Sequence, residues 1–108
     1  MSAHISHRAM RALEAAIRHG SLAGAAGELR VTPTALSHAI KTLEGQLGLT
    51  LLIRSPRGVS ATAEGQHLAE RLSGAFAEID LAVAELKTRS GRLTLAVTPA
   101  FASLWLPP

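Results

Sequence analysis

The 108-residue chain contains no cysteine, which excludes disulfides and cysteine-based zinc sites but leaves the redox compartment open. Aromatic side chains are scarce, with one tryptophan, two phenylalanines and no tyrosine. No apolar run approaches the roughly 20 residues of a membrane-spanning helix, and the opening MSAHISHRAMRA lacks the apolar segment of a signal peptide. We therefore expect one small domain with a modest core, in a soluble, cytoplasmic protein with no membrane partner.

Arrangements typical of catalysis or cofactor binding are also missing. His4 and His7 offer only two ligands, too few for a closed metal site. Ser37 and His38 are adjacent on an expected helix, so their side chains diverge, and no third group completes a catalytic triad. No glycine-rich phosphate-binding motif follows an expected strand. The sequence predicts a protein that is not an enzyme and that binds no metal or cofactor.

Charge is distributed unevenly along the chain. Residues 1–62 hold seven basic and three acidic residues, a net charge of +4, whereas residues 63–89 hold three basic and five acidic residues, a net charge of −2. A basic first half suits a polyanionic partner such as nucleic acid. Ordinary solvated charge on a helical domain explains the same distribution equally well.

Three helices are expected in the first half, over about residues 6–19, 22–29 and 33–47. Apolar residues recur at intervals of three and four in the first and third of them, and a glycine follows each of these two. Ser21 and Thr32 are candidate N-caps for the second and third. The third begins with a proline, which the first turn of a helix tolerates because the missing N–H has no partner there.

A short helix, a tight turn and a second helix form a helix-turn-helix, whose second helix places its polar N-terminal face in the major groove of DNA. Serine and threonine can contact phosphate or base edges, and lysine can reach phosphate or guanine. The alternative is a plain amphipathic helix with a solvated polar face. The candidate DNA contacts in this region are Ser21, Arg30, Thr32, Pro33, Thr34, Ser37, His38 and Lys41.

The segment LLIRSPRGVSAT predicts a β-hairpin after the third helix. Strands over about residues 51–54 and 59–61 would flank a type I turn at residues 55–58. A two-stranded hairpin in this position is a wing, and Arg54 and Arg57 are candidate contacts to phosphate or to the minor groove. An unengaged surface arginine remains the alternative for Arg57.

Residues 63–88 predict a long helix of about 25 residues, close to 40 Å in length. Its apolar residues follow about three heptads of a dimerisation seam, and the simplest partner is the same helix of a second copy. Packing within one chain is the alternative. The expected dimer interface comprises Leu68, Leu72, Ala75, Phe76, Ile79, Val83 and Leu86.

Taken together, these segments resemble the N-terminal region of LysR-type transcriptional regulators over about residues 5–90. The resemblance lies in HGS before the second expected helix, in VTPTALSHAIKTLE, in LG after it and in RGVSATAEG. The final stretch, GRLTLAVTPAFASLWLPP, resembles the start of the effector-binding domain, particularly in the subgroup of the glycine-cleavage activator and the beta-lactamase regulator. Leu13 and Leu52 stand where phenylalanine is common in this family, which predicts a smaller core.

The resemblance implies a mainly α-helical winged helix-turn-helix domain over residues 5–62 and a linker and dimerisation helix over residues 63–89. Residues 90–108 would then begin an effector-binding domain, and we expect this stretch to be poorly ordered and coinducer sensing to be lacking.

The function implied is that of a bacterial transcription regulator that binds an operator in double-stranded DNA near a promoter as a homodimer or tetramer. RNA polymerase and a small-molecule coinducer are further partners in such a family. Two alternatives stay open. The chain could instead form mixed dimers with full-length relatives as an interaction protein, or it could be the winged-helix domain of another regulator family.

Overall fold

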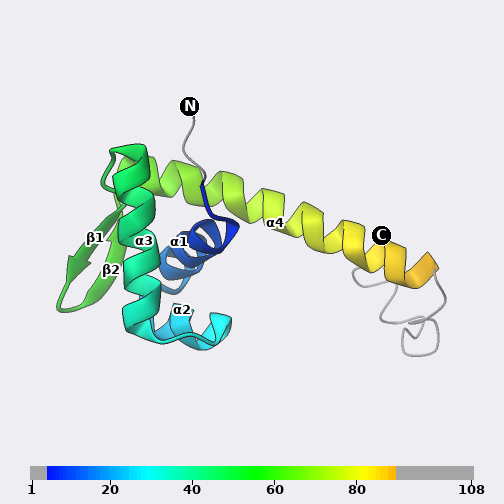
Figure 1. Ribbon diagram of the computed structural model, residues 1–108, viewed down its shortest axis with the longest axis horizontal. Helices are drawn as coiled ribbons and strands as arrows, with labels where there is room; N and C mark the ends of the chain where they lie inside the picture. Colours follow the sequence, from blue (N-terminus) through cyan, green and yellow to red (C-terminus); the bar gives the residue numbers. More distant parts are fainter. Residues whose placement is uncertain (1–4, 90–108) are drawn as a thin grey trace. The chain divides into compact units, whose positions relative to one another are not determined.

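The computed structural model describes residues 5–89 of the chain (Figure 1). In chain order its elements are α1 (His7–His19), α2 (Leu22–Leu29), α3 (Pro33–Leu47), β1 (Leu52–Ser55), β2 (Gly58–Ala61) and α4 (Ala63–Arg89). The chain divides into two compact units, Met1–Gly74 and Ala75–Pro108, and α4 begins in the first and ends in the second. This mainly α-helical architecture confirms the predicted winged helix-turn-helix with a long following helix. The predicted poor order of residues 90–108 lies outside the described residues.

Capping residues mark the beginning and the end of helices α1 and α3. Ser6 caps α1, since its hydroxyl accepts from the N–H of Ala9 at 3.2 Å, and Thr32 caps α3 by accepting from Ala35 at 3.0 Å. Gly20 and Gly48 end the same two helices with φ of 69°, the left-handed conformation that glycine adopts without strain. The predicted helix boundaries therefore agree with the structure to within one residue.

The end of α2 is less ordinary, because an arginine occupies the left-handed conformation. Arg30 has φ of 59°, and its N–H donates to the carbonyl oxygens of Ala26 and Gly27. This conformation costs a non-glycine residue roughly 1–2 kcal/mol. It turns the chain sharply from α2 toward the N-cap of α3.

The core of the first unit lies where α1 packs against α2 and α3. Its largest fully buried side chains are Leu13, Leu36, Ile40, Leu43 and Leu51. Buried alanines of α1 and α2 let the helices approach closely: Ala9, Ala12, Ala15, Ala16, Ala25 and Ala26. Because the apolar stripe of α3 is buried in this core, its opposite, polar face is left at the surface.

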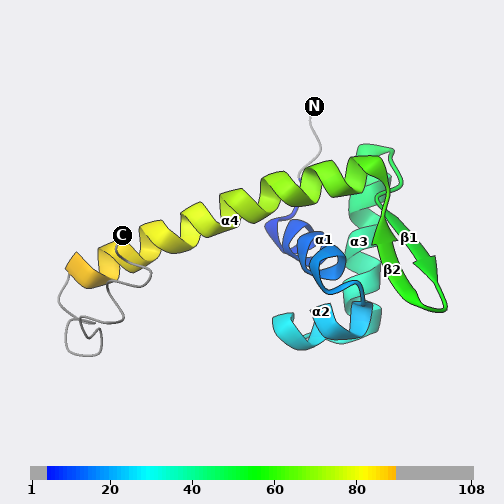
Figure 2. The same ribbon diagram turned by 180° about the vertical axis from the view of Figure 1, so that it is seen from behind.

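The wing is an antiparallel hairpin that projects on the side of α3 in both views (Figures 1 and 2). Its register pairs Leu52 with Ala61 and Ser55 with Gly58. The strands occupy residues 52–55 and 58–61, so the predicted spans were each off by one residue. Gly58 has φ of +133°, and a Cβ there would lie 2.5 Å from the carbonyl oxygen of Gly20, so glycine is required where the wing meets the end of α1.

The start of α4 is held against the backbone of the segment before β1. The hydroxyl of Thr62 donates to the carbonyl oxygen of Thr50 at 2.7 Å and accepts from the N–H of Gly65 at 3.0 Å. A Cβ at Gly65 would lie only 2.0 Å from the carbonyl oxygen of Leu51. This close passage leaves room for glycine alone. Neither α4 nor any other helix within residues 5–89 combines the length and the apolar character that crossing a membrane requires.

This contact predicts a large loss of stability in Gly65→Ala. The added methyl group overlaps the Leu51 carbonyl, and relief by backbone movement should lower the free energy of unfolding by about 2–3 kcal/mol. The measurement is urea denaturation followed by circular dichroism. Gly45→Ala in α3 is the matched control, because a Cβ there meets no atom within 4 Å and should stabilise the helix by about 0.5–1 kcal/mol. Equal effects of the two substitutions would contradict the close passage.

Candidate nucleic-acid interface

The predicted contact residues of α3 lie together on one exposed face at its N-terminal end. They line a shallow hollow of about 430 Å³ whose walls are Leu22, Pro33, Thr34, Ser37, His38 and Lys41. The side chains of Thr34, His38 and Lys41 are exposed, and Ser37 is half-buried. Leu22, the first residue of α2, was not among the predicted contacts, because its place beside α3 depends on the turn between the helices. The hollow therefore presents hydroxyl, imidazole and ammonium groups around an open centre.

A hydrogen bond connects the wing to this face. Arg54 in β1 donates from Nη1 to the Oγ of Ser37 at 2.9 Å, across a separation of 17 residues in sequence. Both residues were predicted as DNA contacts, but nothing in the sequence indicated that they would touch each other. The bond places a guanidinium group of the wing directly beside the exposed polar face of α3.

Glu44 fixes the chain between α3 and the wing. Its Oε2 accepts from the backbone N–H groups of Leu51 at 2.7 Å and Leu52 at 3.1 Å. Its own carbonyl oxygen accepts from Gly48 and Leu49, which closes the end of α3. Hydrogen bonds to an ionised carboxylate are stronger than those between neutral groups. Sequence reasoning missed this residue, since the backbone donors that it binds carry no side-chain signal.

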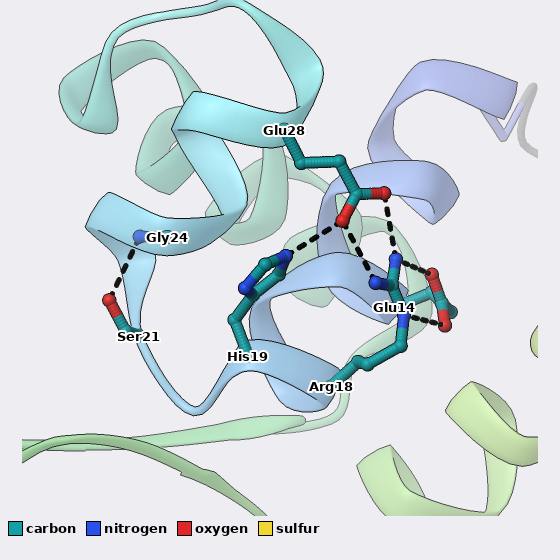
Figure 3. A network of polar contacts seen from close by, with 6 residues as sticks. All are labelled: Glu14, Arg18, His19, Ser21, Gly24 and Glu28. Atoms are coloured by element: carbon teal, nitrogen blue, oxygen red, sulfur yellow. Dashed lines mark hydrogen bonds and ion pairs between the residues drawn. The ribbon is translucent and has the colours of Figure 1, made fainter.

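An ion-pair cluster connects α1 to α2 (Figure 3). The guanidinium of Arg18 donates to Glu14 at 2.8 and 2.9 Å and to both carboxylate oxygens of Glu28 at 2.8 Å. His19 Nε2 lies 2.7 Å from Glu28 Oε1. Hydrogen bonds from Arg18, and then from His19, lower the pKa of Glu28 to about 2. The hydrogen bonds that Arg18 donates to Glu14 and Glu28 raise the pKa of Arg18 further above its usual value.

This cluster was not predicted, although the spacing of Glu14 and Arg18 by four residues is a recognisable helical ion pair. It holds the two helices together just before Ser21, whose hydroxyl caps α2 by accepting from Gly24 at 2.9 Å (Figure 3). The charge of Arg18 is thus paired with two carboxylates at the surface of the domain, which reduces its contribution to attraction of a polyanion.

Other cations of the first unit are placed differently. Arg30, Lys41 and Arg57 are exposed, and within residues 5–89 none of the three is paired with a carboxylate. Arg57 lies in the turn of the wing. Arg30 borders a second hollow of about 810 Å³, which reaches from α1 to α3 and also includes Arg8, Arg11 and His38. Arg8 and Arg11 were not among the predicted contacts.

Between residues 5 and 89, no three histidine, aspartate or glutamate side chains converge as metal ligands.

On α4 the predicted dimer residues fall into two groups. Leu72 and Phe76 are only 9% and 6% exposed within the single chain. Ile79, Val83 and Leu86 are 45%, 47% and 66% exposed and form the open part of the apolar seam.

The other predicted dimer residues also differ in solvent exposure. Leu68 is half-buried and Ala75 is exposed. Leu81, which was not predicted, is 37% exposed and lies with Leu86 in a hollow along the second half of α4. The exposed apolar surface of α4 therefore lies toward its C-terminal half.

Comparison with known proteins gives a family match within the first unit. Residues 7–66 match the family described as bacterial regulatory helix-turn-helix protein, lysR family. An uncharacterized HTH-type transcriptional regulator, y4mQ of Sinorhizobium fredii, is 44% identical over 101 residues, covering 93% of this chain and 34% of that protein. The glycine cleavage system transcriptional activator of Escherichia coli is 43% identical over 102 residues, covering 93% of this chain and 33% of that protein. The chain thus spans about a third of the length of these curated relatives.

Solved structures give the same result. ArgP from Mycobacterium tuberculosis superposes with a TM-score of 0.70 at 34% identity, covering 78% of this chain and 32% of that one. The BenM_DBD/catB site 1 DNA complex superposes with a TM-score of 0.70 at 30% identity, covering 77% and 92% of the two chains. These relatives are transcriptional regulators or DNA-binding domains rather than enzymes.

The ion-pair cluster predicts that stability decreases in acid. Because the fold lowers the pKa of Glu28 from 4.5 to about 2, ionised Glu28 stabilises the folded state fully above pH 4.5, and this stabilisation is lost as the pH falls toward 2. Glu28→Gln should remove that part of the pH dependence in urea denaturation between pH 6 and pH 2.5. Solvent screening of a side chain that is 38% exposed keeps the effect below about 1 kcal/mol.

Glu70→Gln is the matched control, since within residues 5–89 its carboxylate contacts only Gln66 on its own helix. This variant should keep the acid dependence of the unsubstituted chain. A Glu28→Gln profile that follows the control at every pH would argue against the cluster.

Proposed function

The chain belongs to the LysR family of bacterial regulatory helix-turn-helix proteins, and from this premise we propose that it binds a specific operator in double-stranded DNA near a promoter. In this proposal α3 enters the major groove and the β1–β2 wing lies on the backbone or in the minor groove. The observation that carries it is the exposed polar N-terminal face of α3, with Arg54 of the wing bonded to Ser37 at its centre. Relatives of similar fold have been solved in complexes with DNA, including BenM_DBD and CbnR_DBD.

In this proposal, one set of residues contacts the bases and another set contacts the phosphates. Thr34, Ser37, His38 and Lys41 surround the hollow and are placed to reach base edges, since a helix reads bases through its N-terminal residues. The residues around this centre contact the sugar–phosphate backbone or lie close to it, and they are Ser21, Arg30, Thr32, Pro33, Arg54 and Arg57. Phosphate contacts supply affinity that falls steeply with salt, whereas base contacts supply sequence preference.

The same proposal includes a homodimer formed through α4. Ile79, Val83 and Leu86 are spaced by four and three residues, the repeat of a helix–helix seam, and all three are exposed in the single chain. Two copies related by a two-fold axis would present two α3 helices to a palindromic operator. The proposal extends to a tetramer, to contact with RNA polymerase and to a cytoplasmic location. A coinducer would bind outside residues 5–89.

A double substitution tests base readout. Ser37→Ala combined with His38→Ala should weaken binding to the DNA upstream of the protein's own gene by about 10- to 100-fold, because each of the two lost hydrogen bonds to a base is worth roughly 0.5–1.5 kcal/mol. Binding to scrambled DNA should change much less. The measurement is fluorescence anisotropy on both duplexes at two salt concentrations.

Arg57→Ala is the matched control for this experiment. It should weaken binding to both duplexes alike and reduce the salt dependence by about one phosphate contact. An equal loss of affinity on both duplexes in the double variant would remove Ser37 and His38 from base readout.

Substitution in the open part of the seam tests the dimer. Ile79→Glu combined with Val83→Glu should give monomers in sedimentation equilibrium, because two charges would be buried between apolar helices without partners. Glu78→Gln with Glu85→Gln, on the same part of α4, should leave the dimer intact. A dimer that persists in the Ile79/Val83 variant would place the interface on another surface.

A further inference from the structure

The hydrogen bond between Arg54 and Ser37 has a direction. The Arg54 guanidinium can only donate, so the Ser37 hydroxyl is the acceptor in this 2.9 Å contact. A serine hydroxyl has one proton to donate and two positions that accept. Arg54 occupies one accepting position, and the proton must therefore point away from the guanidinium. Within residues 5–89 the Ser37 hydroxyl donates no hydrogen bond.

Ser37 lies where the proton of its hydroxyl can reach a DNA base. Ser37 lines the hollow at the N-terminal end of α3 together with Thr34, His38 and Lys41. A base edge that enters the hollow meets a hydroxyl whose proton is not engaged by the protein. A hydroxyl that accepts from a cation also becomes a stronger donor, because hydrogen bonds in a chain polarise one another.

We propose that Arg54 is a positioning residue that fixes Ser37 as a hydrogen-bond donor, so that Ser37 selects a base with an acceptor on its major-groove edge. The acceptors available there are N7 of adenine or guanine, O6 of guanine and O4 of thymine, whereas cytosine presents its N4 amino donor. This proposal rests on the operator binding proposed above and deepens it. It makes base preference at one operator position depend on a residue of the wing.

Loss of Arg54 changes the hydroxyl as well as the charge. Without the guanidinium, the Ser37 hydroxyl is free to rotate and to donate to a carbonyl of the preceding helical turn, as helical serines commonly do. The hydroxyl proton then points to that carbonyl and no longer to the base. Arg57 differs in this respect, because it carries the same charge on the same hairpin but makes no hydrogen bond or ion pair with α3 within residues 5–89. Substitution of Arg57 therefore removes a charge alone, whereas substitution of Arg54 removes a charge and also the contact that positions Ser37.

The test is selection of preferred sites from a pool of random DNA duplexes by the unsubstituted chain, Arg54→Ala, Arg57→Ala, Ser37→Ala and the Ser37→Ala/Arg54→Ala double variant. Circular dichroism and thermal unfolding establish that each variant is folded. All four variants are expected to select a recognisable motif. Arg54→Ala and Ser37→Ala should lose about five-fold in base preference at one shared position, the effect of a single hydrogen bond. The double variant should lose no more there, and Arg57→Ala should keep the full preference at reduced affinity.

A second measurement uses the selected site itself. The preferred base is replaced by 7-deazaadenine if it is adenine, by 7-deazaguanine and separately by 2-aminopurine (which lacks O6) if it is guanine, and by cytosine in a C·G pair if it is thymine. The replacement that removes the acceptor should weaken binding of the unsubstituted chain about five-fold and leave binding of Ser37→Ala unchanged. A motif that Arg54→Ala retains at every position, or that Arg57→Ala loses at the same position, overturns the positioning role. Failure of the unsubstituted chain to select any motif overturns operator binding itself, and the positioning role with it.

Discussion

The carboxylate of Glu44 is the constraint on which the candidate interface depends. By accepting from the N–H groups of Leu51 and Leu52, it sets the direction in which the chain leaves α3 and enters β1. The side chain of Arg54 can reach Ser37 only because β1 starts at this fixed point. A single charged acceptor in the last turns of α3 thus determines how two separate elements meet at one surface.

The core supports that surface from behind. Leu36, Ile40 and Leu43 hold one side of α3 in the domain, so its polar side has a fixed orientation. The ion-pair cluster connects the last turn of α1 to Glu28 in the last turn of α2, and Leu22 at the other end of α2 lines the hollow. Rigid placement of contact residues reduces the conformational entropy that is lost on binding.

Features that depend on neighbouring residues could be predicted from the sequence. The N-cap at Thr32 with proline after it, and the glycines that end α1 and α3, act within a few residues of themselves, and the structure contains them as expected. The wing was predicted from its turn residues, with the first strand placed one position too early and the second strand started one position too late. Its exact register depends on where Glu44 holds the chain, and that residue is seven or more positions away.

Features that depend on distant pairing could not be predicted. The contact between Arg54 and Ser37 spans 17 residues, and the bond between Arg18 and Glu28 spans ten. No local rule assigns an arginine to the left-handed end of α2 either, since glycine or asparagine is the usual choice there. On α4 the heptad pattern identified one apolar face, but it could not distinguish Leu72 and Phe76, which are buried within one chain, from residues left open to a partner.

The absence of a side chain at Gly65 has a consequence for protein engineering. A regulator can be given a new output by joining its DNA-reading part to a foreign domain through the long helix. Any such junction must lie beyond Gly65, because a helix supplied from another protein would bring a Cβ into the carbonyl group of Leu51. A chimaera that keeps the passage of α4 beside Leu51 therefore has to keep glycine at position 65.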